Sequence, residues 1–438
     1  MECIVIEGGK RLEGRVTVSG AKNSSLPILV AALMADGESV IHRVPVLYDV
    51  QTLIEILQNL GLQVERYGDG SIHTRIVDEA NCEAPYEHVR RMRASVCVLG
   101  PLLAKRGRAR VSLPGGCVIG TRPIDLHLKG LAALGAKIEV KHGYVEARAK
   151  ELVGCPIFLG GAFGSSVLGT ANVMMAATLA KGRTIIECAA SEPEVQDLAH
   201  FLNALGARIT GIGSHRLVIE GVERLEGAEH KVIPDRIEAG TFMVAGAITR
   251  GDVIVDGVCF DHMMAIADKL KEAGVDIEKI EGKGTSSPRY DGLDAVRVSA
   301  FGGVKATDVT TLPYPGFPTD MQAQLMALLS VGDGISVVTE KVYPDRFMHV
   351  AELNRMGADI RKEGESAIIK GVRALSGAEV MASDLRASAA LLLTGLVAMG
   401  KTTVNRAYHI RRGYERLEEK LKGLGANIGT DERPEACY

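Results

Sequence analysis

The feature that most constrains the fold of this 438-residue chain is a short phrase that recurs along its length. Each copy ends an apolar-periodic helical segment with Leu-Gly-Ala or a close variant, then continues through a charged or polar residue into a strand. The six copies begin at Leu60, Leu134, Leu205, Ala273, Met356 and Leu424. Glycine suits the position after a helix because it adopts a left-handed backbone without a Cβ clash. The phrase therefore predicts a helix and then a strand at six places.

A second apolar helix, a glycine turn and a strand precede most copies, as in 174–186, 242–255 and 391–404. Each unit thus reads strand, helix, strand, helix, strand over roughly 70 residues, longer than the roughly 20–50 residues of solenoid repeats. We therefore expect closure into globular lobes, most simply with three units in each. The helices at 174–180 and 387–399 are almost wholly apolar, which predicts that they lie inside the lobes with sheets around them.

Composition argues against several classes of function. The chain has 51 Lys and Arg against 54 Asp and Glu, and its net charge of -3 predicts no basic face for nucleic acid. The longest apolar run, 387–400, is shorter than the roughly 18–20 residues of a membrane span. The N-terminus carries acids where a signal peptide is basic. We expect a cytoplasmic α/β protein that binds neither membrane nor nucleic acid, and the sequence leaves its oligomeric state open.

One of the eight cysteines has unusual surroundings. Cys117 lies between Gly116 and Gly120, and Arg122 follows five residues later. Glycines let a loop move and a nearby cation lowers the pKa of a thiol, so Cys117 is a candidate acid or nucleophile. The spacing alone favours the alternative, a structural turn that contains a cysteine by chance. No C-x-x-C pair or Cys/His ligand spacing occurs, so we expect no metal site and no cofactor.

Further candidate residues occur where strands or loops meet helices. Lys22 follows a small-residue turn that can bind an anion, although the spacing is not that of a P-loop and Ser24 is equally a helix cap. Asp320 precedes an apolar helix and is either a cap or a general base. Arginines that can pair with carboxylate or phosphate oxygens stand in small-residue contexts at Arg91, Arg93, Arg386, Arg411 and Arg412.

Several longer motifs complete the pattern. They are Gly20-Ala21-Lys22-Asn23, Met92-Arg93-Ala94-Ser95, the Cys117 loop, Pro234-Asp235-Arg236-Ile237-Glu238, 317–324, Arg346-Phe347-Met348-His349-Val350, Asp384-Leu385-Arg386-Ala387-Ser388-Ala389 and Arg412-Gly413-Tyr414-Glu415-Arg416. Together these motifs closely resemble those of the UDP-N-acetylglucosamine 1-carboxyvinyltransferase family, and the resemblance runs from residue 1 to about 428. It implies an inside-out α/β barrel pair with three repeats in each lobe and the active site between the lobes. Residues 1–20 with 233–438 are then expected in one lobe and 21–232 in the other.

The resemblance also implies the reaction and its donor site. The family transfers the enolpyruvyl group of phosphoenolpyruvate to the 3′-hydroxyl of UDP-N-acetylglucosamine, the first committed step of peptidoglycan synthesis. By analogy, the donor's phosphate is bound by Lys22, Arg122 and Arg412, with Arg93 nearby, and its carboxylate by Arg386. Asp320 takes the proton of the hydroxyl and Cys117 delivers a proton to C3, so the implied catalytic residues are Lys22, Cys117, Asp320 and Arg412.

The implied acceptor site extends over both lobes. Asn23, Asp320 and Val342 contact the aminosugar. The uridine is bound by Arg122, Pro123, Ile124, Asp125, Leu126 and His127, and Arg93 also belongs to the acceptor site. Ser166 and Val167 contact the diphosphate. In this last stretch Leu168 stands where many relatives have glycine, and its side chain is expected to crowd the approach to the diphosphate.

Three other functions fit parts of the pattern. Shikimate-3-phosphate enolpyruvyl transfer shares the fold and the donor, but it is not expected to use the Cys117 loop. A catalytically silent sugar-nucleotide sensor is disfavoured by the presence of Lys22, Cys117, Asp320 and Arg412 together. An RNA-end-processing relative built from similar repeats is disfavoured by the near-neutral charge.

Overall fold

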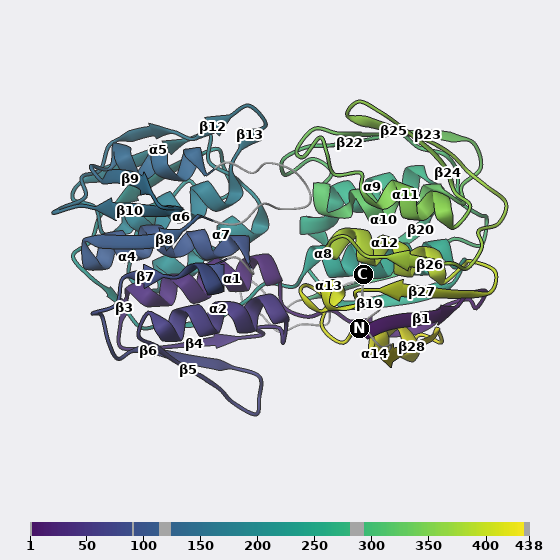
Figure 1. The fold of residues 1–438 in the computed structure, drawn as a ribbon, viewed down its shortest axis with the longest axis horizontal. Coiled ribbons are helices and arrows are strands. Elements are labelled where there is room, and N and C mark those ends of the chain that lie inside the picture. Colours follow the sequence, from purple (N-terminus) through teal and green to yellow (C-terminus); the bar gives the residue numbers. More distant parts are fainter. Residues whose placement is uncertain (1, 90–91, 114–123, 281–292, 433–438) are drawn as a thin grey trace. The chain divides into compact units, whose positions relative to one another are not determined.

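The computed structural model describes residues 2–89, 92–113, 124–280 and 293–432, and these form two compact units (Figure 1). Unit 1 contains the described residues of 2–19 and 234–432, and unit 2 those of 20–233. Within the described residues, the chain passes from one unit to the other after Ser19 and after Ile233.

Unit 2 contains three four-stranded sheets. Their strand orders are β18 (Glu229–Lys231), β4 (Glu38–His42), β6 (Ile72–Ile76), β5 (Leu62–Arg66); β7 (Glu83–Ala84), β8 (Arg108–Ser112), β10 (Tyr144–Arg148), β9 (Lys137–Lys141); and β11 (Pro156–Phe158), β14 (Arg183–Glu187), β16 (Arg216–Glu220), β15 (Arg208–Thr210). Two short ribbons pair β3 (Ala35–Asp36) with β17 (Leu225–Glu226) and β12 (Gly160–Gly161) with β13 (Gly164–Ser165). The helices are α1 (Lys22–Ala31), η1 (Ala32–Met34), α2 (Tyr48–Asn59), α3 (Tyr86–Val89), η2 (Arg93–Val98), α4 (Leu99–Arg106), α5 (Asp125–Ala133), α6 (Val167–Thr178) and α7 (Pro193–Ala204).

Unit 1 repeats this arrangement. Its sheets are β2 (Glu13–Thr17), β19 (Asp252–Val258), β21 (Asp294–Ser299), β20 (Asp276–Ile280); β22 (Val309–Thr311), β23 (Ile335–Glu340), β25 (Ser366–Lys370), β24 (Asp359–Glu363); and β26 (Glu379–Met381), β27 (Lys401–Asn405), β1 (Glu2–Glu7), β28 (Asn427–Glu432). The helices are α8 (Arg236–Ile248), η3 (Phe260–Met263), α9 (Met264–Glu272), η4 (Thr319–Met321), α10 (Gln322–Leu329), α11 (His349–Arg355), α12 (Leu385–Gly395), α13 (Tyr408–Arg411) and α14 (Leu417–Gly423).

The six sheets share one topology, which confirms the predicted six-fold repeat. In every four-stranded sheet the first two strands pair in parallel and the remaining pairs are antiparallel. The glycine of each recurring phrase has a positive φ, between +82° and +104°. The strands that follow these glycines are β5, β9, β15, β20, β24 and β28.

Each repeat contains one more strand than the sequence predicts. The strand after the glycine turns back in a hairpin, as β9 does into β10 through His142 and Gly143, which have φ of 51° and 77°. Two central residues with positive φ form the tight turn that matches the twist of paired strands. In the last repeat, β1 from the N-terminus takes the place of this extra strand, so the repeat is completed by residues far away in the sequence.

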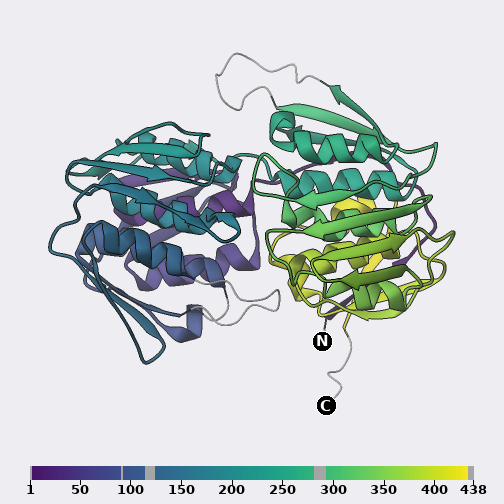
Figure 2. The ribbon, with the colours of Figure 1, turned by 90° about the horizontal axis from the view of Figure 1, so that it is seen from above.

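Apolar helices form the centre of each unit, with sheets outside them (Figure 2). In unit 1, α8, α10 and α12 contact one another and consist almost entirely of buried residues. In unit 2, α6 is buried over Gly169–Thr178 and contacts α4, α5 and α7. The expectation that the apolar helices lie inside the lobes is therefore confirmed, although α12 ends at Gly395, before the residue 399 that the sequence predicts.

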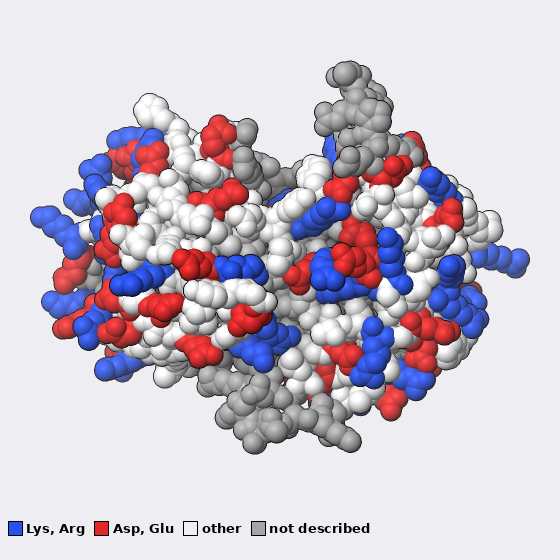
Figure 3. Space-filling model, turned by 90° about the horizontal axis from the view of Figure 1, so that it is seen from below, with Lys and Arg blue, Asp and Glu red and all other residues white. Residues whose placement is uncertain are grey.

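The surface carries mixed charge. On the face shown in Figure 3, Lys and Arg side chains are interspersed with Asp and Glu over both units. In the part of the chain that the structure describes, no helix is long and apolar enough to cross a membrane.

Candidate active site

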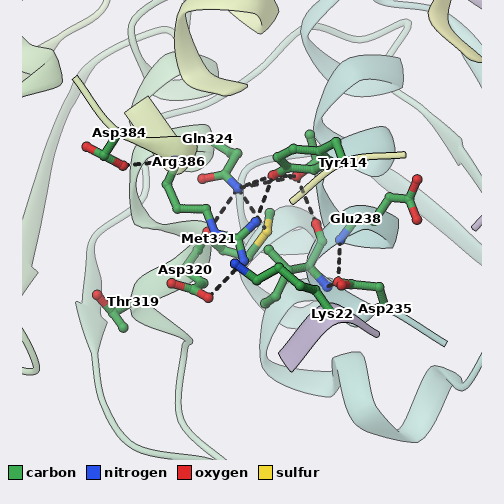
Figure 4. A network of polar contacts seen from close by, with 12 residues as sticks. Lys22, Asp235, Glu238, Thr319, Asp320, Met321, Gln324, Asp384, Arg386 and Tyr414 are labelled. Carbon is green, nitrogen blue, oxygen red and sulfur yellow. Dashed lines mark hydrogen bonds and ion pairs between the residues drawn. The ribbon is translucent and has the colours of Figure 1, made fainter. Parts of the chain in front are cut away.

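In unit 1, a carboxylate lies between two buried guanidinium groups, of which Figure 4 shows that of Arg386. Asp320 stands in η4, immediately before the apolar helix α10. Its Oδ2 accepts a hydrogen bond of 2.9 Å from Nη2 of Arg386, and its Oδ1 accepts one of 2.9 Å from Nη1 of Arg346. The side chains of both arginines are 5% exposed, whereas that of Asp320 is 26% exposed. The carboxylate is therefore the accessible member of the cluster.

The arginines decide the protonation state of Asp320. Burial alone raises the pKa of a carboxyl group, but Arg386 and Arg346 outweigh it and hold the pKa of Asp320 well below its usual range. The carboxylate therefore stays ionised at neutral pH. Ionisation is the first requirement for a general base, because a protonated carboxyl group cannot accept a proton.

The position of Arg386 is set by the start of helix α12. Asp384 caps this helix by accepting hydrogen bonds from the backbone N–H of Arg386 and Ala387, at 2.8 and 3.2 Å. On its other side, Nη1 of Arg386 donates to the hydroxyl of Tyr414 at 3.2 Å. That hydroxyl also contacts the side chains of Thr241 and Gln324, at 2.9 and 3.2 Å. Side chains of α8 and α10 thus hold the Tyr414 hydroxyl, and through it the guanidinium of Arg386.

A second buried carboxylate, Glu340, organises the loop beside Asp320. One of its oxygens accepts hydrogen bonds from the backbone N–H of Val342 and Tyr343 and from the hydroxyl of Thr311. The other accepts one of 2.9 Å from Thr319, the residue before Asp320. Glu340 is fully buried. It therefore links the position of Val342, a predicted acceptor contact, to that of η4.

In unit 2, the predicted lysine and asparagine begin a helix. Lys22 is the first residue of α1, and its Nζ lies 3.2 Å from a carboxylate oxygen of Asp49 in α2. These side chains are 12% and 6% exposed, so the pair is largely buried. Ser24 does not cap α1, because the N-cap is Ala21 and the Ser24 hydroxyl donates to the buried Asp197 instead. The capping alternative for Ser24 was therefore wrong.

The predicted uridine-binding stretch begins helix α5 in its described part. Asp125 and Leu126 open the helix and Ile124 precedes it. His127 is 4% exposed, and its Nδ1 lies 3.0 Å from the amide nitrogen of Asn172 in α6. Burial, with Arg93 adding to it, lowers the pKa of His127 to about 4, so the imidazole is neutral. The ring thus packs between helices.

The predicted diphosphate contacts lie at the start of helix α6. Ser166 is the N-cap, and its hydroxyl accepts a hydrogen bond of 3.1 Å from the N–H of Gly169. Val167 and Leu168 are the first residues of the helix, and the Leu168 side chain is half-buried. A helix start presents backbone N–H groups and a favourable dipole to an anion.

The remaining predicted residues lie at or near helix starts and ends, or outside the described residues. Arg93 begins η2, Asn23 is the second residue of α1, and Arg412 follows α13, all of them half-buried. Arg411 forms ion pairs with Glu2 and Glu418. Cys117, Arg122, Pro123 and Arg91 lie outside the described residues.

Three residues that hold the site together have no role predicted from the sequence: Arg346, Glu340 and Tyr414. Arg346 and Tyr414 stand in motifs that carry the family resemblance, but each of the three has side-chain partners from distant segments. A signal was present in α10, where Gln322 and Gln324 interrupt an apolar helix. The Gln322 amide donates to the backbone carbonyl of Arg346, at 3.1 Å.

Comparison with known proteins places this chain among relatives of the same length. Residues 6–421 match the family of EPSP synthase (3-phosphoshikimate 1-carboxyvinyltransferase). The chain is 55% identical to UDP-N-acetylglucosamine 1-carboxyvinyltransferase 2 of Carboxydothermus hydrogenoformans, over 98% of this chain and 99% of that protein. It is 54% identical to UDP-N-acetylglucosamine 1-carboxyvinyltransferase of Methylacidiphilum infernorum, over 98% of each chain.

Solved structures show the same fold at lower identity. The enolpyruvyl transferase NikO of Streptomyces tendae superimposes with a TM-score of 0.87 at 24% identity, over 99% of both chains. EPSP synthase of Acinetobacter baumannii gives a TM-score of 0.75 at 19% identity, over 98% of this chain and all of that one. The predicted enolpyruvyl transferase fold is therefore confirmed. By its match to the family model and its identity to curated relatives, the chain belongs to the EPSP synthase family and, within it, to the UDP-N-acetylglucosamine 1-carboxyvinyltransferases.

Proposed function

We propose that this chain transfers the enolpyruvyl group of phosphoenolpyruvate to the 3′-hydroxyl of UDP-N-acetylglucosamine and releases phosphate, at the start of peptidoglycan synthesis. The observation that carries the proposal is identity of 52–55% over almost the whole chain to relatives that bear this name. Relatives with EPSP synthase structures are only 19% identical. This difference favours the sugar nucleotide over shikimate 3-phosphate as acceptor.

The proposed chemistry has two proton transfers. Asp320 accepts the proton of the 3′-hydroxyl while the hydroxyl oxygen forms a bond to C2 of the donor, and Cys117 delivers a proton to C3. The resulting tetrahedral ketal then loses phosphate and a proton from C3, which restores the double bond. Lys22, Arg122 and Arg412, with Arg93 nearby, bind the phosphate in this proposal, and Arg386 binds the carboxylate. The ionised state of Asp320 supports its role as the base.

For the acceptor, we propose contacts of the aminosugar with Asn23, Val342 and Asp320, and of the diphosphate with the α6 start at Ser166 and Val167. The uridine is assigned to residues 122–127. Within that stretch, the burial of His127 against Asn172 favours a role in positioning α5 rather than a direct contact. We place the reaction in the cytoplasm, where phosphoenolpyruvate is formed.

The experiment that tests this function measures phosphate release from phosphoenolpyruvate with each acceptor in turn. Release with UDP-N-acetylglucosamine and none with shikimate 3-phosphate is the expected result. The Asp320→Asn variant should lose on the order of 10²–10⁴-fold in turnover if Asp320 is the base. Release with shikimate 3-phosphate alone would overturn the proposed acceptor, and an unchanged rate in the variant would remove Asp320 from the mechanism.

A further inference from the structure

Asp320 occupies the arginine that is proposed to bind the carboxylate of the donor. Arg386 is proposed to bind the carboxylate of the donor, yet in the structure its Nη2 already donates to the carboxylate of Asp320 at 2.9 Å. Its Nη1 faces Tyr414. The Arg386 side chain is 5% exposed, and the exposed member of the cluster is Asp320 at 26%. A carboxylate arriving from solvent therefore meets Asp320 first.

We infer that Asp320 is an intramolecular competitor of the donor's carboxylate: it occupies the N–H group of Arg386 that the donor carboxylate takes, and donor binding releases this oxygen of Asp320 toward the acceptor hydroxyl. This inference rests on the proposed function. It predicts that donor binding precedes proton transfer to Asp320, because arginines hold this base until the donor's carboxylate replaces it.

The exchange is energetically balanced because one carboxylate replaces another. Moving Asp320 away without a substitute leaves two largely buried guanidinium groups with less compensation, which is strongly unfavourable. An incoming carboxylate restores equivalent charge-assisted hydrogen bonds. Two guanidinium charges face the single charge of Asp320, so the cluster still attracts an anion. Three other nearby acids are bound by other groups: Asp235 and Asp384 accept backbone N–H groups at the starts of α8 and α12, and Glu340 accepts hydrogen bonds from backbone N–H groups and threonine hydroxyls.

The release of Asp320 also changes its reactivity. With both oxygens accepting hydrogen bonds from arginines, and with its pKa well below the usual range, the carboxylate is a weak proton acceptor. When one guanidinium turns to the donor, an oxygen of Asp320 becomes available and its basicity rises. The base is then strong only when the donor that needs it is in place, which limits unproductive proton transfer.

Two donor analogues test this competition in the absence of acceptor. The first, 2-phospholactate, has the phosphate and carboxylate of the donor but no double bond, and the second, ethyl phosphate, lacks the carboxylate. Isothermal titration gives the Kd of each for the wild-type protein and for Asp320→Ala and Asp320→Asn. We expect Asp320→Ala to bind 2-phospholactate on the order of tenfold more tightly, because the competitor is gone. Asp320→Asn should show a smaller gain, since its amide oxygen still accepts one hydrogen bond.

A matched control separates competition from general electrostatics. Asp235 carries a negative charge that acts on Arg386, but its carboxylate caps α8. Asp235→Asn should strengthen both analogues by a similar factor, whereas the Asp320 variants should change the ratio of the two Kd values. An unchanged ratio in Asp320→Ala and Asp320→Asn, or weaker binding of 2-phospholactate, would overturn the inference. Circular dichroism confirms that each variant is folded, and the near-isosteric Asn variant serves if the Ala variant is not.

The proposed function fails in a different way. If the wild-type protein binds neither analogue and releases no phosphate from phosphoenolpyruvate, the donor itself is wrong. If it releases phosphate but the Kd ratio does not move, only the competition is wrong.

Discussion

Loss of Lys420, which pairs with a buried glutamate, should destabilise unit 1 far more than loss of an exposed lysine that also pairs with a glutamate. Nζ of Lys420 donates to Oε1 of Glu238 at 2.6 Å, and the backbone N–H of Ser19 donates to Oε2 at 2.7 Å. Ser19 is the last residue of unit 1 before the chain enters unit 2. Its hydroxyl is bound as well, donating to Glu415 at 2.6 Å and accepting from Lys420 at 2.8 Å. The Glu238–Lys420 pair thus fixes the backbone at Ser19, where the chain first leaves unit 1.

The magnitude follows from distance and burial. At 2.6 Å and an effective dielectric constant of about 20, the Coulomb attraction is about 6 kcal/mol, and desolvation offsets much of it. The side chains of Glu238 and Lys420 are only 3% and 19% exposed. Lys420→Met leaves the carboxylate buried with fewer partners, which costs about 3–5 kcal/mol. That is a large part of the roughly 5–15 kcal/mol that stabilises a folded protein.

The assay is urea denaturation followed by far-UV circular dichroism, since the chain has no tryptophan. The matched control is Lys341→Met, which breaks a Lys–Glu pair with Glu365 of almost equal length, 2.7 Å, whose side chains are 52% and 48% exposed. That change should cost about 0.2–1 kcal/mol. The double variant Glu238→Gln/Lys420→Met should recover part of the loss, because no charge remains buried.

The loss should also depend on pH. Burial raises the pKa of Glu238 from 4.5 to about 7, against the opposing effect of Lys420. The folded protein therefore binds this proton more tightly than the unfolded chain, and the contribution of Glu238 to stability falls as pH rises from about 4.5 to about 7. Lys420→Met should cost more at about pH 8.5 than at about pH 5.5, where the carboxyl is neutral. Equal costs for Lys420→Met and Lys341→Met, or no pH dependence, would refute the reasoning.

Four further changes have expected outcomes. Gly20→Ala places a Cβ 1.8 Å from the backbone oxygen of Arg43, so thermal denaturation should show a loss of about 1–3 kcal/mol or more; an unchanged melting temperature would contradict this steric argument. Asn172→Leu removes the acceptor of the Gly100 N–H and the partner of His127, and urea denaturation should show a loss of about 1–3 kcal/mol. Leu168→Gly should lower the KM for UDP-N-acetylglucosamine in the phosphate-release assay, and an equal KM would show that Leu168 does not crowd the diphosphate. Mass spectrometry should locate labelling by a fosfomycin-like epoxide at Cys117, and labelling elsewhere with Cys117 unmodified would count against its proposed role.

The repeat was predictable because its signal is local. A helix end, a glycine with left-handed backbone and a strand start lie within a few residues, so each copy can be recognised from its own sequence. The extra hairpin strands were missed although one has a comparable local signal. His142-Gly143 between two short runs is a tight turn, but its flanking strands are only five residues each and largely polar, as in Lys137–Lys141. β9 is almost wholly exposed, so its strand conformation comes from pairing with β10 and not from an apolar pattern of its own.

The polar network of the candidate site was not predictable in the same way, because its members come from distant segments. Glu340 binds Thr311 and Thr319 across 29 and 21 residues, and Arg386 reaches Asp320 across 66. At these separations, no spacing in the sequence predicts which residues contact each other. The resemblance to a family identified Asp320 and Arg386 as residues of interest, but only the fold shows that they contact each other.

Three aspartates at helix starts in unit 1 show what the sequence leaves open. Asp235 and Asp384 accept N–H groups from the first residues of α8 and α12, as helix caps do. Asp320 lies one residue farther from its helix, in η4, and caps neither η4 nor α10; Arg386 and Arg346 donate to its two oxygens instead. The difference lies in what faces each carboxylate. A carboxylate that caps its own helix stays in place, whereas a carboxylate held by arginines can be exchanged for another anion. This property makes Asp320, rather than Asp235 or Asp384, suited to move during a reaction.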